Sequence, residues 1–156
     1  PMTVIIGAEA PADGAARTYG FDAIETRIDA LAASSDSAGE AARELIALGE
    51  EVLEHWLRAR GEAPVQEERE GFRLIALHRQ GARGDPSFNA CRETVRELAY
   101  HYNLITLDPS HPDTGKRVRL AAMVAKHLCL FVSGKMQVAG LGEFCCSSRP
   151  LRAGGQ

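Results

Sequence analysis

The sequence predicts an all-α protein, an antiparallel bundle of about five helices. Three observations support this fold class. Apolar residues recur at spacings of three and four along most of the chain, as they do on one face of a helix. Capping residues, glycines and prolines separate these runs. The connections are short, and short connections place consecutive helices side by side in opposite directions.

The chain has 156 residues, a length that suits one compact domain. Residues 1–20 hold a short β-type run followed by Ala, Gly and Pro, so we expect an extended N-terminal arm. Residues 21–134 carry the helical periodicity and form the predicted bundle domain. Residues 135–156 are expected to be an irregular tail, because Gly140 and Gly142 disfavour another long helix.

The first two predicted helices are separated by a serine-rich break. Apolar residues at steps of three, four and three mark the first helix: Phe21, Ile24, Ile28 and Leu31. Residues 34–37 end it and offer an N-cap for the second helix, over 38–60. The core face of that second helix comprises Leu45, Leu48, Val52, Leu53 and Trp56. Gly61 then provides a stop signal.

The third predicted helix begins at Pro64, where proline fits the first helical turn. Glu67, Glu68 and Glu70 follow, and carboxylates suit the positive end of a helix dipole. Residues 72–77 fit both the helical and the strand period, and we interpret them as helix. Residues 80–84 are interpreted as a loop.

Asp85-Pro86 is a strong helix start, a capping carboxylate followed by proline. The apolar stripe of this fourth helix comprises Cys91, Val95, Leu98, Tyr102 and Ile105. The fifth helix, over 114–133, is apolar on most of its circumference and is therefore expected to be central. Its most apolar face comprises Leu120, Val124, His127 and Phe131, and Gly134 is expected to end it. We expect Leu98, Val124 and Phe131 to be buried.

Charge is unevenly distributed along the chain. Residues 1–70 carry six Arg and fifteen Asp or Glu, a net charge of −9, and residues 71–156 carry twelve Lys or Arg and six Asp or Glu, a net charge of +6. Such asymmetry indicates either a charged partner or two halves that face each other, within one fold or across a dimer. The second interpretation is favoured, and a homo-oligomer is expected.

Composition excludes several other classes of protein. No apolar run reaches the roughly 18 residues typical of a membrane span, so no membrane association is expected. Four cysteines are too few for a disulfide framework in a chain of this length, which indicates free thiols and a cytoplasmic location. The arginines at 79–83 lack interleaved aromatic residues, so nucleic-acid binding has no support beyond charge. A small apolar ligand near Trp56, Tyr100 or Tyr102 remains open.

Two matching motifs are the most suggestive chemical feature. Glu51 and His55 on the second helix, and Glu97 and His101 on the fourth, each stand four residues apart on one helix face. Were these helices parallel, the two pairs would lie at similar depths, near His127 of the fifth helix. Carboxylates and imidazoles facing one another in a bundle can hold non-haem iron, manganese or zinc. A divalent metal is therefore a possible cofactor.

Each part of this predicted site has a structural alternative. A Glu and a His at this spacing often form an exposed pair, and a histidine on an apolar face is often a hydrogen-bonded core residue. The sequence therefore favours a protein that acts by binding a protein partner or a small ligand, without an identified catalytic residue. The alternative function is a metal-dependent bundle with a catalytic or sensory role.

Overall fold

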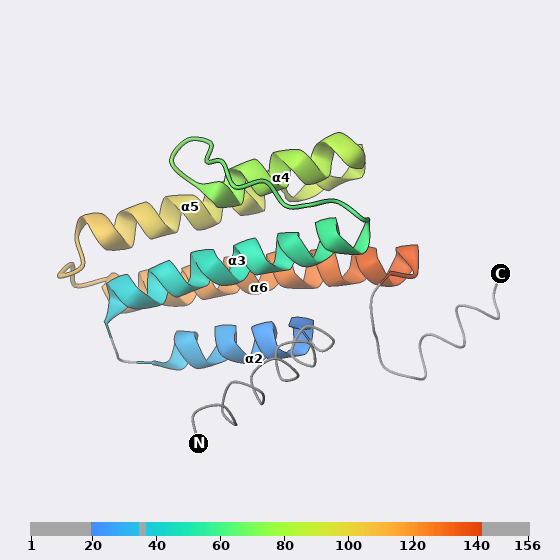
Figure 1. The fold of residues 1–156 in the computed structure, drawn as a ribbon. Coiled ribbons are helices and arrows are strands. Elements are labelled where there is room, and N and C mark those ends of the chain that lie inside the picture. The colour runs from blue at the N-terminus through green and yellow to red at the C-terminus, as the bar shows by residue number, and fades with distance from the viewer. Residues whose placement is uncertain (1–19, 35–36, 142–156) are drawn as a thin grey trace, which may run out of the picture.

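The computed structural model describes residues 20–34 and 37–141, and every regular element in these ranges is a helix (Figure 1). The elements are α2 (Gly20–Ala33), α3 (Ala38–Ala59), α4 (Arg73–Gly84), the 3₁₀ helix η1 (Pro86–Cys91), α5 (Arg92–Leu107) and α6 (Thr114–Ala139). The predicted all-α bundle is confirmed. Residues 1–19 of the expected arm and residues 142–156 of the expected tail lie outside the described residues.

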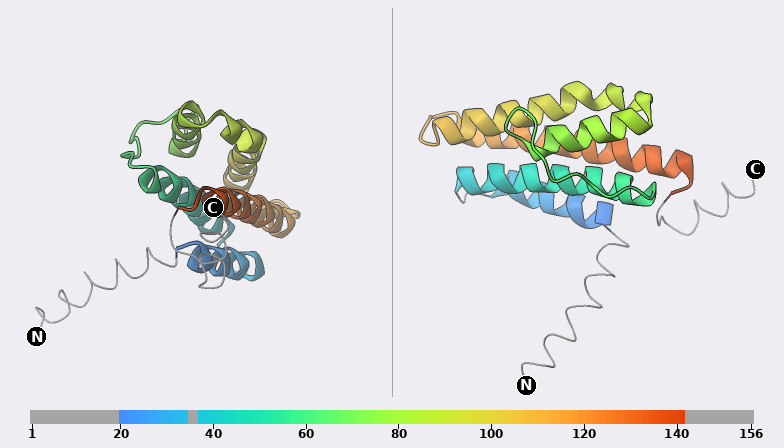
Figure 2. Two further views of the ribbon diagram at one scale, coloured as in Figure 1. Left: turned by 90° about the vertical axis from the view of Figure 1, so that its right-hand side faces the viewer. Right: turned by 45° about the horizontal axis from the view of Figure 1, so that its top comes forward.

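The helices form three levels, with α3 and α6 side by side in the middle (Figures 1 and 2). α2 covers one side of this pair, and α4 and α5 cover the other. α6 packs against α2, α3 and α5, which confirms the prediction that it is central. No helix among the described residues has the length and apolarity needed to cross a bilayer.

The segment between α3 and α4, which we call the strap (residues 61–72), is extended where the sequence predicted a helix from Pro64. Side chains of α4 hold its backbone: the Gln80 Oε1 accepts from Val65 N at 2.9 Å, and Arg73 Nε donates to Val65 O at 2.8 Å. These bonds take the place of helical backbone bonds. The strap runs back along α3, so α4 points in the same direction as α3 (Figure 1).

Two boundaries after the strap also differ from the prediction. The expected loop at 80–84 is the last part of α4, which ends at Gly84. The predicted cap is present, since Asp85 accepts a hydrogen bond from Ser87 N at 3.1 Å, but the turn that it starts is 3₁₀ and the α-helix begins only at Arg92. Pro86 and the large buried ring of Phe88 occupy this tighter turn.

α6 differs from the prediction in its length and in its buried face. It continues through Gly134 and ends at Gly140, whose φ of 72° suits a left-handed C-cap. The side chains it buries are Val118, Ala121, Ala122, Ala125, Leu128, Cys129, Val132 and Met136. Leu120 and His127 are exposed, whereas Val124 and Phe131 are half-buried. Ala121, Ala122 and Ala125 on the inner face let the neighbouring helices approach closely.

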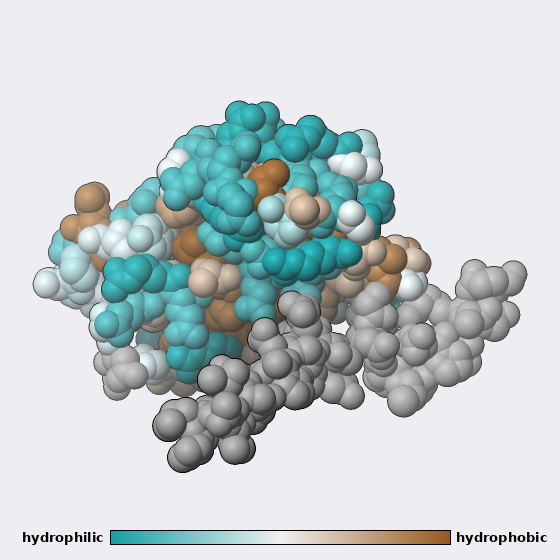
Figure 3. All heavy atoms as spheres, in the orientation of Figure 1, coloured by the Kyte–Doolittle hydropathy of each residue, from teal (hydrophilic) through white to brown (hydrophobic). Residues whose placement is uncertain are grey.

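Some of the acidic residues of the first half of the chain form ion pairs with basic residues of the second half. Arg73 pairs with Glu54, Arg96 pairs with Glu70, and Lys126 pairs with Asp29. Each pair joins a basic residue of the second half of the chain to an acidic residue of the first. The favoured interpretation, two halves that face each other, thus holds inside a single chain for these contacts. Figure 3 shows a mostly hydrophilic surface over the strap and α4.

Candidate functional site

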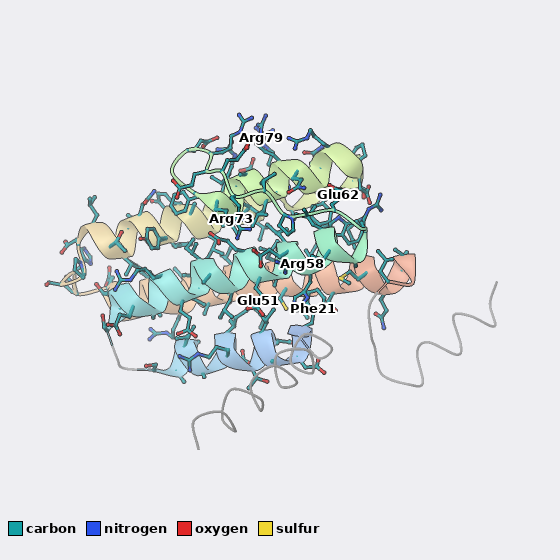
Figure 4. The ribbon with its side chains drawn as sticks, in the orientation of Figure 1. Phe21, Glu51, Arg58, Glu62, Arg73 and Arg79 are labelled. Carbon is teal, nitrogen blue, oxygen red and sulfur yellow. The ribbon has the colours of Figure 1, made fainter. Side chains whose placement is uncertain are left out.

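The first Glu-x-x-x-His motif lies on α3, and its histidine packs against the start of α2. His55 Nε2 lies 3.9 Å from Glu51 Oε2, and the imidazole ring is 5.3 Å from the ring of Phe21. Gly20 lies so close that an added Cβ would fall 2.3 Å from His55 Nε2. Burial and nearby Glu54 raise the pKa of Glu51, while Arg58 opposes them. Figure 4 shows Phe21, Glu51 and Arg58 around this end of α2 and α3.

The second motif, on α5, lies at a different depth. A Cβ on Gly49 of α3 would be 3.1 Å from Leu98 of α5, so these two positions are level. α3 and α5 run in opposite directions because the strap reverses the chain once more (Figure 1). His55 is six residues beyond Gly49 and His101 is three residues beyond Leu98, in opposite directions. At the rise of an α-helix this separates the histidines by about 13 Å along the bundle.

The structure therefore does not bring the two motifs together. His127 lies on the outward face of α6 and is exposed. Across residues 20–34 and 37–141, no group of three or more His, Cys, Asp or Glu side chains could hold a metal ion. A metal site that uses Glu51, His55, Glu97, His101 and His127 stays a prediction from the sequence, without support from this arrangement of helices.

A cavity of about 340 Å³ lies on the other side of the bundle, between α4, η1 and α5. We call it the arginine cleft, because four of its nine lining residues are arginines. The lining comprises Ile75, His78, Arg79, Ala82, Arg83, Asn89, Arg92, Val95 and Arg96. Ile75 and Val95 are buried and form an apolar floor, whereas Asn89 is exposed. In Figure 4, Arg79 projects from the outer side of α4, away from α3 and α6.

Helical spacing places the arginines in two facing rows. Arg79 and Arg83 stand at i and i+4 on α4, and Arg92 and Arg96 stand at i and i+4 on α5. The short 3₁₀ helix η1 joins these two helices and returns the chain, so that the rows line the same cavity. Either row alone would be an ordinary charged helix face.

The positive charge of the cleft is only partly neutralised. Arg96 donates to both carboxylate oxygens of Glu70, each at 2.8 Å. Arg79, Arg83 and Arg92 form no ion pair with any residue in the part of the chain that the structure describes. The hydrogen bonds from Arg96, and then the charges of Arg96, Arg79 and Arg92, hold the pKa of Glu70 below its usual value.

His78 is the buried histidine of the cleft lining, and its pKa favours a neutral ring at neutral pH. Its Nε2 donates to the carbonyl oxygen of Phe88 at 2.9 Å, since that oxygen can only accept. Burial lowers the pKa of His78, and the guanidiniums of Arg92, Arg96 and Arg79 lower it further against the effect of the Phe88 hydrogen bond. A neutral imidazole does not add a fifth positive charge to the cleft.

In the sequence, the signal for this cleft is the matching i, i+4 spacing of Arg79–Arg83 and Arg92–Arg96. The interpretation of residues 80–84 as a loop hides the first pair, because it places Arg83 outside the helix that carries Arg79. The aromatic residues considered for a ligand lie elsewhere: Trp56 is buried, Tyr102 packs on Phe72, and Tyr100 is exposed on α5. None of the three lines the arginine cleft.

Guanidinium groups bind carboxylates and phosphates through paired, charge-assisted hydrogen bonds. Four of them around one cavity, with an amide from Asn89, can therefore hold an anion that carries several charged oxygens. Comparisons of this chain with known protein families, with curated proteins and with solved structures find no match.

Proposed function

We propose that this protein binds a small polyanionic ligand in the arginine cleft. One observation carries the proposal: four guanidinium groups line a single cavity, and three of them have no ion pair among the described residues. Like charges gathered in this way repel one another in the empty protein. An anion that bridges them would relieve this repulsion and bind through charge-assisted hydrogen bonds.

The shape and lining of the cleft favour a small ligand over a nucleic acid. Its volume of about 340 Å³ lies at the lower end of the usual range for small-molecule sites. Its lining includes no Phe, Tyr or Trp ring on which bases could stack. Ile75, Ala82 and Val95 offer an apolar wall for the carbon skeleton of the ligand. The best fit is a compact molecule with two or more phosphate or carboxylate groups.

The proposed role is binding rather than catalysis. His78 is the one titratable group of the lining that could transfer protons near neutral pH. Its Nε2 is already engaged by the Phe88 carbonyl, and burial stabilises its neutral form. These features suit a structural histidine.

Isothermal titration calorimetry with inorganic pyrophosphate, and with citrate as a carboxylate probe, tests the proposal. The double variant Arg79→Gln/Arg92→Gln should lose most of the affinity of the parent protein, about 10-fold or more, because two charge-assisted bonding partners are removed. The matched control is Arg43→Gln/Arg119→Gln, which removes two exposed arginines of α3 and α6. Equal losses in both double variants, or no binding of either probe to the parent, would overturn the proposal.

The homo-oligomer and the cytoplasmic location expected from the sequence stay predictions. The surface that supports self-association is the outward face of α6, where Leu120, Met123, Leu130 and Val138 are exposed at helical spacing. An apolar stripe of this kind is typical of a protein–protein contact. Cys91 and Cys129 are buried free thiols, as expected in a reducing compartment.

A further inference from the structure

The tip of the strap is a tight two-residue turn with an unusual residue in it. Arg69 and Phe72 exchange both backbone hydrogen bonds, at 3.0 and 2.9 Å, so Glu70 and Gly71 form the turn between them. Both turn residues have positive φ, 54° at Glu70 and 85° at Gly71, as a type I′ turn requires. Asn, Asp or Gly is the usual residue at the first of these positions, and glutamate adopts this conformation rarely.

This turn presents the Glu70 carboxylate to the arginine cleft. The carboxylate accepts two hydrogen bonds from Arg96, and its lowered pKa also reflects the charges of Arg79 and Arg92. Glu70 thus binds one of the four guanidiniums that line the cavity and is stabilised by the charges of two others. It does so from the strap, outside the helices that form the cleft.

The strap is fixed on either side of its tip. On one side, Gln80 binds the backbone of Ala63 and Val65. On the other, the ring of Phe72 packs edge-on against Tyr102, with centroids 5.5 Å apart. Residues 66–71 between these anchors are exposed. The tip can therefore leave Arg96 without disrupting the contacts that hold the rest of the strap.

We propose that Glu70 is a tethered competitor for the arginine cleft: its carboxylate occupies the Arg96 guanidinium in place of one anionic group of the ligand, which must displace it. This inference rests on the proposed polyanion-binding function and adds regulation to that site. A ligand that carries a single charge gains little, because at Arg96 it merely takes the place of the Glu70 carboxylate. A ligand with several charges also engages Arg79, Arg83 and Arg92, so Glu70 makes the site selective for polyanions.

Calorimetric titration of pyrophosphate into Glu70→Gln tests the competition. The variant should bind about two- to fivefold more tightly than the parent, because an exposed ion pair of this kind no longer has to be broken. Glu44→Gln is the matched control: Glu44 forms a two-oxygen ion pair with Arg27, between α2 and α3 and away from the cleft. It removes the same charge and should leave the affinity for pyrophosphate unchanged.

Two further measurements separate competition from a structural role. Glu70→Asn places a preferred residue in the type I′ turn, so it should unfold at the same temperature as the parent or higher while binding pyrophosphate as tightly as Glu70→Gln. In the parent, pyrophosphate should speed amide hydrogen exchange in residues 66–72, because the tip is released. A merely structural Glu70 would not produce this change.

The possible failures are distinct. If pyrophosphate binds in a manner that depends on Arg79 and Arg92, but Glu70→Gln binds equally or more weakly, the competition is overturned and the binding function stands. As a control, amide hydrogen exchange at residues 66–72 should be no faster in free Glu44→Gln than in the free parent. If neither the parent nor Glu70→Gln binds pyrophosphate, the binding function itself fails, and the competition fails with it.

Discussion

The ring of Phe88 stacks on the indole of Trp56, with centroids 5.0 Å apart and planes 27° from parallel. This contact joins η1 to α3 across the bundle. Phe88 is fully buried and also meets the ring of Phe131 on α6, at 6.0 Å. Because η1 is the only connection between α4 and α5, the anchoring of Phe88 fixes how the two arginine rows of the cleft face each other.

Phe88→Ala should therefore be strongly destabilising. A buried phenylalanine truncated to alanine costs about 3–5 kcal/mol in the free energy of unfolding, from lost burial and an unfilled cavity. Urea denaturation followed by circular dichroism measures it. Phe131→Ala is the comparison, and its half-buried ring should cost clearly less. A loss below about 1 kcal/mol for Phe88→Ala would show that η1 is not anchored in this way.

Two glycine substitutions should act in opposite directions. A Cβ on Gly81 of α4 would lie 3.0 Å from Cδ2 of Phe88, so Gly81→Ala forces the ring to move and should destabilise by about 1–3 kcal/mol. A Cβ on Gly134 meets nothing within 4 Å, and Gly134→Ala should stabilise α6 by about 0.5–1 kcal/mol through helix propensity. Thermal unfolding of both variants measures the difference. Stabilisation by Gly81→Ala would contradict the close approach.

The depressed pKa of His78 predicts a pH dependence of stability. Unfolded His78 protonates near its ordinary pKa of 6.5, whereas the folded ring stays neutral to lower pH because of burial and the nearby arginines. Below pH 6.5 the unfolded state therefore binds more protons, and stability falls as the pH falls toward the lowered pKa. Stability from this group is retained above pH 6.5.

Urea denaturation at several pH values between 7.5 and 5 checks this expectation. His78→Gln keeps an amide donor for the Phe88 carbonyl but cannot titrate, so its free energy of unfolding should fall less steeply with decreasing pH than that of the parent. The pH slope is the quantity compared, since the variant also changes packing at every pH. Identical slopes would mean that His78 titrates alike in the folded and unfolded states.

Self-association, where it occurs, should depend on the outward face of α6. Met123 is 66% exposed in the middle of the apolar stripe, so Met123→Glu places a charge there without disturbing the core. Light scattering of the parent should show an oligomer, and the variant should shift it toward the monomer. Glu97→Gln, on the exposed side of α5, serves as a surface control. A parent that is monomeric at low and at high salt would contradict the prediction.

Local signals in the sequence were enough to predict α2, α3, the cap at Asp85 and the start of α6. A cap such as Ser37, which accepts from Glu40 N at 3.3 Å, acts on its own first turn, and helical periodicity repeats within a few residues. These features depend on neighbours in the chain. They are therefore readable without knowledge of the fold.

The strap could not be predicted in this way. Pro64 and the glutamates after it fit a helix start, but Gln80 and Arg73 bind the backbone of residues 63 and 65 from α4. The buried face of α6 was equally difficult to predict, because the sequence of a helix that is apolar on most sides does not indicate which side faces the core. Packing against three neighbouring helices decided which face of α6 is buried, and it is the face that carries the alanines. His127 lies on the opposite, exposed face. The strap reverses the chain between α3 and α4, and this separates His55 from His101.

The sequence by itself determined the helical class and most helix positions, since these follow from short-range spacing. Only the tertiary structure decided that the Arg79–Arg83 and Arg92–Arg96 rows face one cavity, and that Glu70 reaches Arg96 from the strap. These relationships depend on the stacking of Phe88 on Trp56 and on side chains that bind the strap, contacts between residues far apart in the chain.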